Sequence, residues 1–175
     1  MAEQQLVDCA RNFVTYGCGG GLPSHAYTYA YYNGIMLESD YPYQAKEGVC
    51  KYDPTKTAVS VFGSFNITEL DEPAMEMAVA NVGPVTISFT VESDFKSYAG
   101  GVYDNKNCRD TIHDVNHDVQ IVGYGTDNGI PYWTVKNSWG QRFGEQGYFK
   151  IRRGVNRCGL ARCSAFPVGV HPFSH

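Results

Sequence analysis

A histidine and an asparagine in one short stretch of the chain could act together in proton transfer. His117 is followed by an apolar run that ends in glycines, and Asn137 follows a second run at residues 132–135. Apolar runs closed by glycines are typical of strands. The turn residues 126–129, which include an Asn-Gly pair, separate the two runs and predict a hairpin. We therefore expect His117 and Asn137 to lie near the same end of that hairpin.

An asparagine beside a histidine has a definite chemical use. If the side-chain oxygen of Asn137 accepts a hydrogen bond from one imidazole nitrogen of His117, it fixes the tautomer and leaves the other nitrogen free to transfer a proton. The indole of Trp139 could cover that bond and exclude water. The alternative is a hairpin with a buried histidine and a polar turn. The local pattern alone does not separate these two interpretations.

Length and composition narrow the class of protein. A chain of 175 residues with 43% hydrophobic content can form one domain or two small lobes with an ample core. The net charge of -4, without a basic cluster, argues against nucleic acid as the main partner. The 13 tyrosines and 19 glycines favour strands and turns over a helical bundle. No apolar stretch approaches the roughly 18 residues that a membrane span requires.

The cysteines and the N-terminus give conflicting indications. The six cysteines are Cys9, Cys18, Cys50, Cys108, Cys158 and Cys163. Because they include no Cys-x-x-Cys pair, a structural zinc site is not expected, and their number suits an oxidising compartment. The polar N-terminus does not resemble a secretory signal. The simplest resolution is that the chain is a piece of a longer precursor.

The remaining patterns predict a helix-and-loop lobe over residues 1–65 and a β-rich lobe over residues 66–175 that carries the histidine and the asparagine. Helices are expected over residues 3–7, from Pro23 to Gly34, and after an Asp71 cap. Strands are expected over residues 57–65, 85–91 and 147–152. Residues 18–21 form a glycine-rich loop that is either a flexible turn or a backbone surface for a ligand. The triplet that begins at Asn66 is a glycosylation sequon, meaningful in a secreted chain.

Several blocks of the sequence resemble the papain-like cysteine peptidases, and within that family the cathepsin H group. The matching blocks are EQQLVDC at 3–9, GCGGGLPSHAY at 17–27, YPY at 41–43, VNHDVQIVGYG at 115–125, NGIPYWTVKNSWG at 128–140, GYFKIRRG at 147–154 and CGLARC at 158–163. The resemblance implies an α+β, papain-like two-lobe fold. In this chain the fold would be truncated to a partial helical left lobe and an antiparallel, β-barrel-like right lobe.

The resemblance also implies an activity and a set of site residues. The activity is cofactor-independent hydrolysis of peptide bonds by an amino- or endopeptidase, lysosomal or secreted. His117 resembles the general base and acid, Asn137 the group that orients it, and Trp139 the tryptophan that shields their bond. The residues that resemble the substrate-binding surface are Gly20 and Gly21, for backbone pairing with an extended peptide, and the pocket residues Leu22, Pro23, Ser88 and Val115.

The nucleophile of the family is absent from these residues. The family signature is Cys-Gly-[Ser/Ala]-Cys-[Trp/Tyr], about 130–150 residues before the histidine and asparagine. Counting back about 130 residues from His117 leads to a position before Met1. The attacking group in this chemistry is a thiolate, which a histidine cannot replace. We therefore expect the chain to be inactive alone.

The family pattern implies disulfides Cys9–Cys50 and Cys108–Cys158. It leaves Cys18 unpaired, because its usual partner lies in the missing segment. It matches Cys163 to the cysteine that tethers a propeptide remnant in cathepsin H, so the expected partners are peptides, that remnant and the missing segment, with no nucleic acid or membrane.

Two residues depart from the family. Asp118 replaces an alanine beside the histidine and would favour the charged imidazole if it is near enough. Phe143 replaces a second tryptophan and is interpreted as a packing change.

Three functional hypotheses remain open at this point. The chain is the C-terminal portion of a cysteine peptidase, or a non-catalytic pseudo-peptidase that binds peptides or inhibitors as a decoy or regulator, or a truncation product with an exposed apolar face. A Cys-Gly-Ser-Cys-Trp-like motif upstream of Met1 would favour the first over the second.

Overall fold

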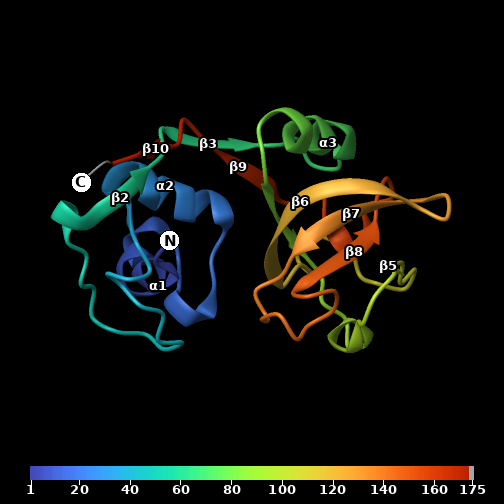
Figure 1. Ribbon diagram of the computed structural model, residues 1–175, viewed down its shortest axis with the longest axis horizontal. Coiled ribbons are helices and arrows are strands. Elements are labelled where there is room, and N and C mark those ends of the chain that lie inside the picture. The colour runs from blue at the N-terminus through green and yellow to red at the C-terminus, as the bar shows by residue number, and fades with distance from the viewer. Residues whose placement is uncertain (174–175) are drawn as a thin grey trace. The chain divides into compact units, whose positions relative to one another are not determined.

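The computed structural model describes residues 1–173, which form two compact units (Figure 1). The first unit contains Met1–Phe65 together with the segment that begins at Pro167, and the second contains Asn66–Phe166. Each unit has its own buried core. Within the described residues, every helix is too short or too polar to cross a bilayer.

The first unit combines two helices with a small antiparallel sheet. Its elements are α1 Glu3–Cys9, η1 Ala10–Phe13, η2 Gly17–Gly19, α2 Pro23–Asn33, β1 Ile35–Met36, η3 Pro54–Lys56, β2 Thr57–Ser60 and β10 His171–Pro172. The sheet order is β1-β2-β10. Helix α2 begins with a proline and ends at Gly34, whose φ of 70° is readily adopted only by glycine. The helices expected at 3–7 and from Pro23 to Gly34 are therefore present.

A buried glutamine joins α1 to the sheet of the first unit. Gln5 is fully buried, and its Nε2 donates to the Tyr29 hydroxyl at 2.9 Å and to the Gly34 carbonyl at 3.0 Å. Its Oε1 accepts from the Met36 backbone N–H at 2.8 Å. The side chain is thereby satisfied in the core, as a buried amide requires. The disulfide Cys9–Cys50, expected from the resemblance, also holds α1.

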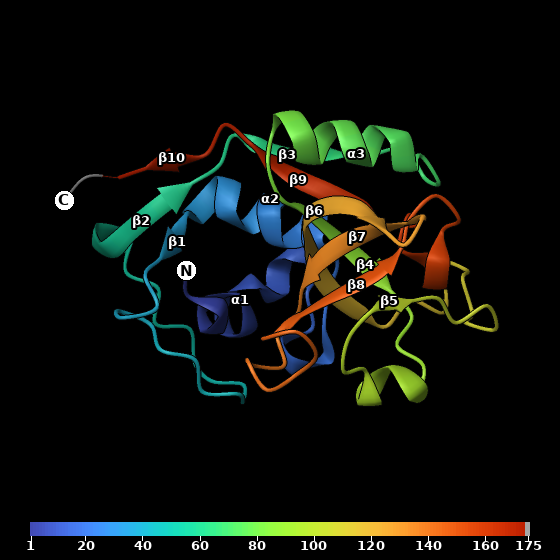
Figure 2. The ribbon, with the colours of Figure 1, turned by 45° about the vertical axis from the view of Figure 1, so that its right-hand side comes forward.

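The second unit is built on a sheet with the order β3-β9-β4-β6-β7-β8-β5. Its elements are α3 Glu72–Asn81, β4 Val85–Phe89, η4 Asp94–Ser97, β5 Val102–Tyr103, β6 His117–Asp127, β7 Ile130–Lys136, β8 Tyr148–Arg152 and η5 Arg157–Gly159. The strands β3 Gly63–Asn66 and β9 Ser164–Val168 span the two points at which the chain passes from one unit to the other. Figure 2 shows β6 and β7 as long neighbouring strands with β8 beside β7. These pairings are antiparallel, whereas β5 pairs with β8 in parallel.

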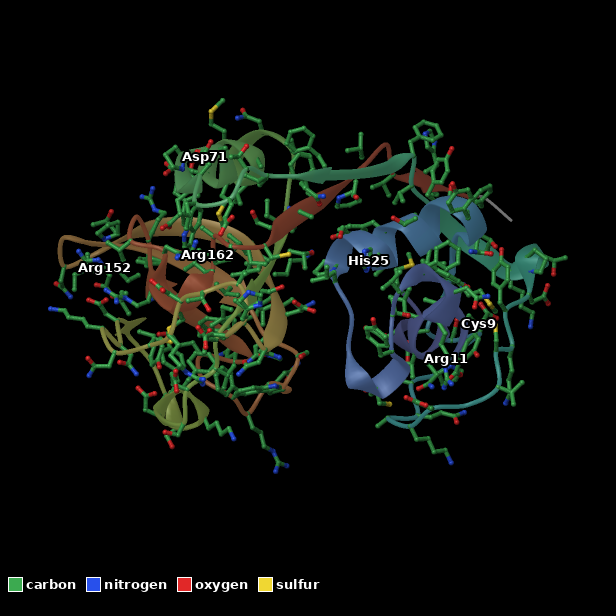
Figure 3. All side chains as sticks on the ribbon, turned by 180° about the vertical axis from the view of Figure 1, so that it is seen from behind. Cys9, Arg11, His25, Asp71, Arg152 and Arg162 are labelled. Atoms are coloured by element: carbon green, nitrogen blue, oxygen red, sulfur yellow. A yellow bond between two sulfur atoms is a disulfide. The ribbon has the colours of Figure 1, made fainter. Side chains whose placement is uncertain are left out.

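Helix α3 is fixed to this sheet through its first residues. Asp71, which is labelled in Figure 3, lies at the start of the helix. It caps the helix, as expected, by accepting from the Ala74 backbone N–H at 2.9 Å. Glu72 is buried, and its Oε2 accepts from Trp133 Nε1 at 2.8 Å and from the Gly154 N–H at 2.7 Å. Its Oε1 accepts from the Asn156 N–H at 2.6 Å. One carboxylate thus ties α3 to β7 and to the turn after β8.

Two expectations about the chain's organisation differ from the structure. The stretch 57–65, read as one strand, is divided into β2 and β3, because the chain turns at Phe62 and Gly63, which has a φ of 152°. Residues 66–175 were assigned to the second lobe, whereas the segment from Pro167 belongs to the first unit, where β10 pairs with β2. A two-residue strand at a chain end carries no pattern that reveals its partner.

Candidate active site

His117 and Asn137 meet at one end of the β6–β7 hairpin, as the sequence predicts. His117 is the first residue of β6, and Asn137 directly follows β7. His117 Nε2 lies 2.9 Å from Asn137 Oδ1, and Asn137 is buried. The backbone N–H of Ser138 donates to the same oxygen at 2.8 Å. Because that donor identifies the atom as the amide oxygen, Nε2 must carry the proton, and Nδ1 is left as the base.

The side of the sheet on which the imidazole lies follows from the alternation of β6. His117, Val119 and Ile121 occupy one side, and Val119 and Ile121 are buried in the core. His117 is paired in register with Phe89 of β4, and their rings lie 5.9 Å apart. The half-buried imidazole therefore rests on the edge of an apolar core.

Aromatic rings surround the histidine and hold Trp139 against it. The Trp139 and His117 ring centroids are 5.0 Å apart with an interplanar angle of 31°. Trp139 makes edge contacts with Phe95 at 5.7 Å and with Phe143 at 4.9 Å. Phe143, interpreted from the resemblance as a replacement for a tryptophan, packs inside this aromatic cluster. The indole keeps 40% of its surface exposed, so it covers the imidazole from the solvent side.

The chain that leads into His117 is anchored to the end of β4. The Asn116 backbone N–H donates to the Phe89 carbonyl at 3.1 Å, and Asn116 Oδ1 accepts from the Val91 N–H at 2.9 Å. Val115, a predicted pocket residue, is half-buried beside Gly159, where an added Cβ would lie 3.2 Å from Val115 Cγ1. These contacts fix the backbone immediately before the imidazole, and the sequence gives no local signal for them.

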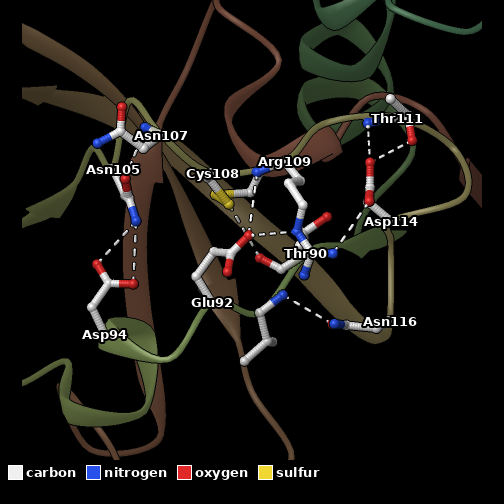
Figure 4. Close-up of polar contacts among 12 residues, drawn as sticks. Thr90, Glu92, Asp94, Asn105, Asn107, Cys108, Arg109, Thr111, Asp114 and Asn116 are labelled. Atoms are coloured by element: carbon white, nitrogen blue, oxygen red, sulfur yellow. Dashed lines mark hydrogen bonds and ion pairs between the residues drawn. A yellow bond between two sulfur atoms is a disulfide. The ribbon is translucent and has the colours of Figure 1, made fainter.

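A polar network secures the loop that precedes Asn116 (Figure 4). Arg109 contacts Glu92 at 3.1 Å and Asp114 at 3.5 Å. The Thr111 hydroxyl donates to Asp114 at 2.5 Å, and this bond is the main reason that the pKa of Asp114 is lowered. The disulfide Cys108–Cys158, also expected from the resemblance, closes the same loop.

The opposite side of β6 carries a row of three side chains: Asp118 on β6, Ser88 on β4 and Cys163 directly before β9. Asp118 is paired with Ser88 of β4, and the Ser88 hydroxyl donates to Asp118 Oδ1 at 2.5 Å. The Ser88 backbone N–H donates to the carbonyl of Cys163, the residue before β9, at 3.0 Å. Residues opposite one another project to the same side of a sheet. Cys163, Ser88 and Asp118 therefore face away from the side that carries the imidazole.

Burial governs the two ionisable groups of this row. It raises the pKa of the Asp118 carboxyl, against the lowering effects of the Ser88 hydroxyl and the charge of His117. Asp118 is nevertheless exposed as a residue, so its carboxyl is only partly removed from solvent. Burial also raises the pKa of the half-buried Cys163 thiol, against a hydrogen bond with Ser88. Cys163 is therefore protonated at neutral pH and is a poor nucleophile.

The remaining predicted substrate-binding residues belong to the first unit. Gly20 follows η2 with a φ of 97°, and its carbonyl accepts from the Tyr16 N–H at 2.8 Å. Gly21 forms an isolated bridge with Thr15. Leu22 is the N-cap of α2, and Pro23 is its first residue. Gly20, Gly21 and Leu22 are exposed and Pro23 is half-buried, so one loop of this unit presents all four.

Comparison with known proteins assigns the family. The sequence profile of the papain family cysteine protease group matches residues 1–168. The chain belongs to this family. Pro-cathepsin H of Bos taurus is 54% identical over 169 residues, which are 96% of this chain and 50% of that protein. Pro-cathepsin H of Mus musculus is 53% identical over 96% of this chain and 51% of its own length.

The solved structures confirm the expected α+β papain-like fold. Digestive procathepsin L 3 of the Tenebrio molitor larval midgut superposes with a TM-score of 0.91 at 37% identity, covering 95% of this chain and 55% of that one. Digestive procathepsin L2 proteinase of the same tissue gives a TM-score of 0.90 at 44% identity, covering 95% and 52%. The chain spans about half the length of the curated relatives it matches.

Proposed function

We propose that this chain binds peptides and carries the proton-transfer half of a papain-family peptidase site, and that the 175 residues alone do not hydrolyse peptides. The observation that supports the first part is the 2.9 Å contact between His117 Nε2 and an Asn137 oxygen whose identity Ser138 fixes. This arrangement leaves Nδ1 of His117 as the atom that accepts and returns a proton.

Each residue of the pair has a separate task in the proposed reaction. A cysteine thiolate attacks the peptide carbonyl, His117 gives its proton to the leaving amine, and water then hydrolyses the acyl-enzyme with His117 as the base. Asn137 holds the imidazole in one tautomer and one orientation. Trp139 shields their bond, as its position over the His117 ring allows.

The free thiols of the chain support the second part of the proposal. Four cysteines form disulfides, which leaves Cys18 and Cys163. Cys163 lies on the side of the sheet away from His117, and burial raises its thiol pKa. Cys18 is exposed in η2, where its backbone N–H donates to Glu47 at 3.1 Å. The signature of the family nucleophile surrounds neither cysteine.

The test is to incubate the purified chain with an amino-acid aminomethylcoumarin and with an epoxide that traps active thiolates. We expect no fluorophore release above that of a His117→Ala control. Hydrolysis that the epoxide abolishes, with label on Cys18 or Cys163 by mass spectrometry, would contradict the proposal. Peptide binding is measured by the fluorescence change of Trp139, with Trp139→Phe as the control. The absence of any binding would refute the peptide-binding part.

A second candidate is a non-catalytic peptide-binding protein that acts as a decoy or regulator. It is favoured by one observation: the 175 residues retain the His117–Asn137 pair and lack the signature of the nucleophile. The two candidates differ in the reading frame upstream of Met1 in the transcript. A Cys-Gly-Ser-Cys-Trp-like motif encoded there would favour the C-terminal portion of a peptidase over the decoy.

The proposal extends to the compartment and to Cys163. The two disulfides suit an oxidising, lysosomal or secreted location. The half-buried free thiol of Cys163 is the proposed attachment point of a propeptide remnant. Non-reducing mass spectrometry of the native protein tests this, because a tethered remnant would add a mass that reduction removes.

A further inference from the structure

Among the described residues, Asp118 differs from most acidic side chains of its unit in having no ion pair with an arginine or a lysine. Several of the others contact an arginine or a lysine; the pairs are Glu69–Arg162, Glu76–Arg153, Glu92–Arg109, Asp104–Arg157 and Glu145–Lys150. Among the contacts of the described residues, Asp118 has one hydrogen bond, from the Ser88 hydroxyl to Oδ1. These contacts include none to the second carboxylate oxygen, Oδ2, and the residue as a whole is exposed. A carboxylate that is partly desolvated and unpaired favours a cation from outside the chain.

The neighbours of Asp118 make a surface suited to a long basic side chain. The row runs from the Cys163 thiol, directly before β9, to the Ser88 hydroxyl on β4 and ends at the carboxylate on β6. Adjacent strands are about 4.8 Å apart, so the row extends roughly 10 Å. In the chain without a tethered remnant, where the Cys163 thiol is free, the aliphatic stem of a lysine or arginine could lie over the thiol and the hydroxyl with its charged head at the carboxylate.

The row lies close to the proton-transfer residue although it faces the other side of the strand. His117 and Asp118 are the first two residues of β6, and the charge of His117 lowers the pKa of the Asp118 carboxyl. A peptide bound over this end of β6 would therefore lie within one residue step of both groups along the strand. Ser88 is buried and fixed by its own backbone bond, which holds the carboxylate in one orientation.

We propose that Asp118 is a charge-selecting residue, whose free oxygen Oδ2 receives a positively charged group of a bound peptide beside His117. The proposal rests on the proposed function, because it needs a peptide at this end of the hairpin. The cation is the side chain of an arginine or lysine, or the α-ammonium group of the peptide, and the two sources share one chemistry. A neutral residue at Asp118 would remove the selection and leave binding of the uncharged part.

The experiment compares matched peptides on the full 175-residue chain. Acetyl-Ala-Arg-Ala-Ala amide is compared with its citrulline counterpart, which has the same shape without the charge, and each is also prepared with a free N-terminus. Binding is measured by Trp139 fluorescence and by calorimetry at low and high salt. Wild type should prefer arginine by about two- to fivefold, a preference that falls as salt screens the contact.

Three variants isolate the carboxylate. Asp118→Asn should bind both peptides equally, and Asp118→Glu should keep the preference for arginine. Asp110→Asn is the control for net charge, because Asp110 is an exposed acid of the same unit whose side chain makes none of the described contacts. It should keep the full preference. Near-ultraviolet circular dichroism establishes that each variant retains the packing of its aromatic cluster.

The outcomes separate this inference from the proposed function. Equal binding of arginine and citrulline peptides by wild type overturns the role of Asp118 and leaves peptide binding intact. The role of Asp118 is also overturned if Asp118→Asn still prefers the arginine peptide. The same holds if the control variant Asp110→Asn loses that preference. A preference that follows the free N-terminus instead of arginine identifies the α-ammonium group as the cation. If no peptide binds any form, both the inference and the peptide-binding proposal fail.

Discussion

The two sides of the β4–β6 strand pair differ in what surrounds their side chains. On one side His117 rests on Phe89 and lies beneath Trp139, so the imidazole has aromatic neighbours and one polar partner, Asn137. The neighbouring pair, Asp118 and Ser88, faces the other side. There Asp118 accepts a hydrogen bond from the Ser88 hydroxyl and is exposed to solvent. A single step along a strand thus separates a residue held for proton transfer from one available to a ligand.

The largest expected effect is on the aromatic side. Phe89 is fully buried between His117, Phe95 and Phe149, so Phe89→Ala should destabilise the chain by about 3–5 kcal/mol. Ser88→Ala, the matched change on the other side of β4, removes one hydrogen bond and should cost about 1 kcal/mol. Urea unfolding measures both. Similar losses for the two variants would show that the sides do not differ in packing.

The next effect concerns the partner of the imidazole. Asn137→Ala leaves Nε2 of His117 without its acceptor, and the chain should lose about 1–2 kcal/mol of stability. The more specific readout is the nitrogen chemical shifts of His117, which report the tautomer. Wild type should show a protonated Nε2 and the variant a mixture of both forms. An unchanged tautomer in the variant would mean that Asn137 does not orient the ring.

The smallest effect is a pH dependence on the polar side. Because burial raises the pKa of Asp118 in the folded state, ionisation of this group opposes folding. The stability that it contributes is present below the unfolded pKa of about 3.9 and is lost as the pH rises through the folded pKa. Asp118→Asn should therefore be slightly more stable than wild type at neutral pH, and the difference should vanish in acid.

The groups that face Asp118 set the control for this titration. They are the Ser88 hydroxyl and the charge of His117, which lower its pKa, and the thiol of Cys163 across the row. Repeating the comparison in a Ser88→Ala background should enlarge the difference, because the Ser88 bond opposes the shift. A difference that is the same at all pH values would assign it to packing instead of ionisation.

Local patterns in the sequence revealed the elements that form within short stretches of chain. The hairpin at residues 117–136 and the Asp71 cap each depend on residues close in sequence, and both are present. The contact between His117 and Asn137 followed from the hairpin alone, because the turn brings its two ends together.

The features that local patterns missed depend on register between distant strands. The row of Cys163, Ser88 and Asp118 requires β9, β4 and β6 to be neighbours in a specific alignment. A shift by one residue would place Asp118 on the core side, and nothing within β4 or β9 alone excludes that. The buried Glu72 was likewise hidden, because its donors come from residues more than sixty positions away. The pairing of the cysteines in the two disulfides was predicted from the family resemblance, because cysteine spacing alone does not determine it.

The disulfide Cys108–Cys158 has a consequence for backbone cleavage. The bridged cysteines are 50 residues apart, and the hairpin with His117 and Asn137 lies entirely between them. A single cut inside this loop leaves both fragments in one covalent molecule, so its mobility on a non-reducing gel does not change. If the cut lies in the turn between β6 and β7, reduction would release two fragments, one with the histidine and one with the asparagine. A nicked hairpin therefore retains both halves of its histidine–asparagine pair until the disulfide is reduced.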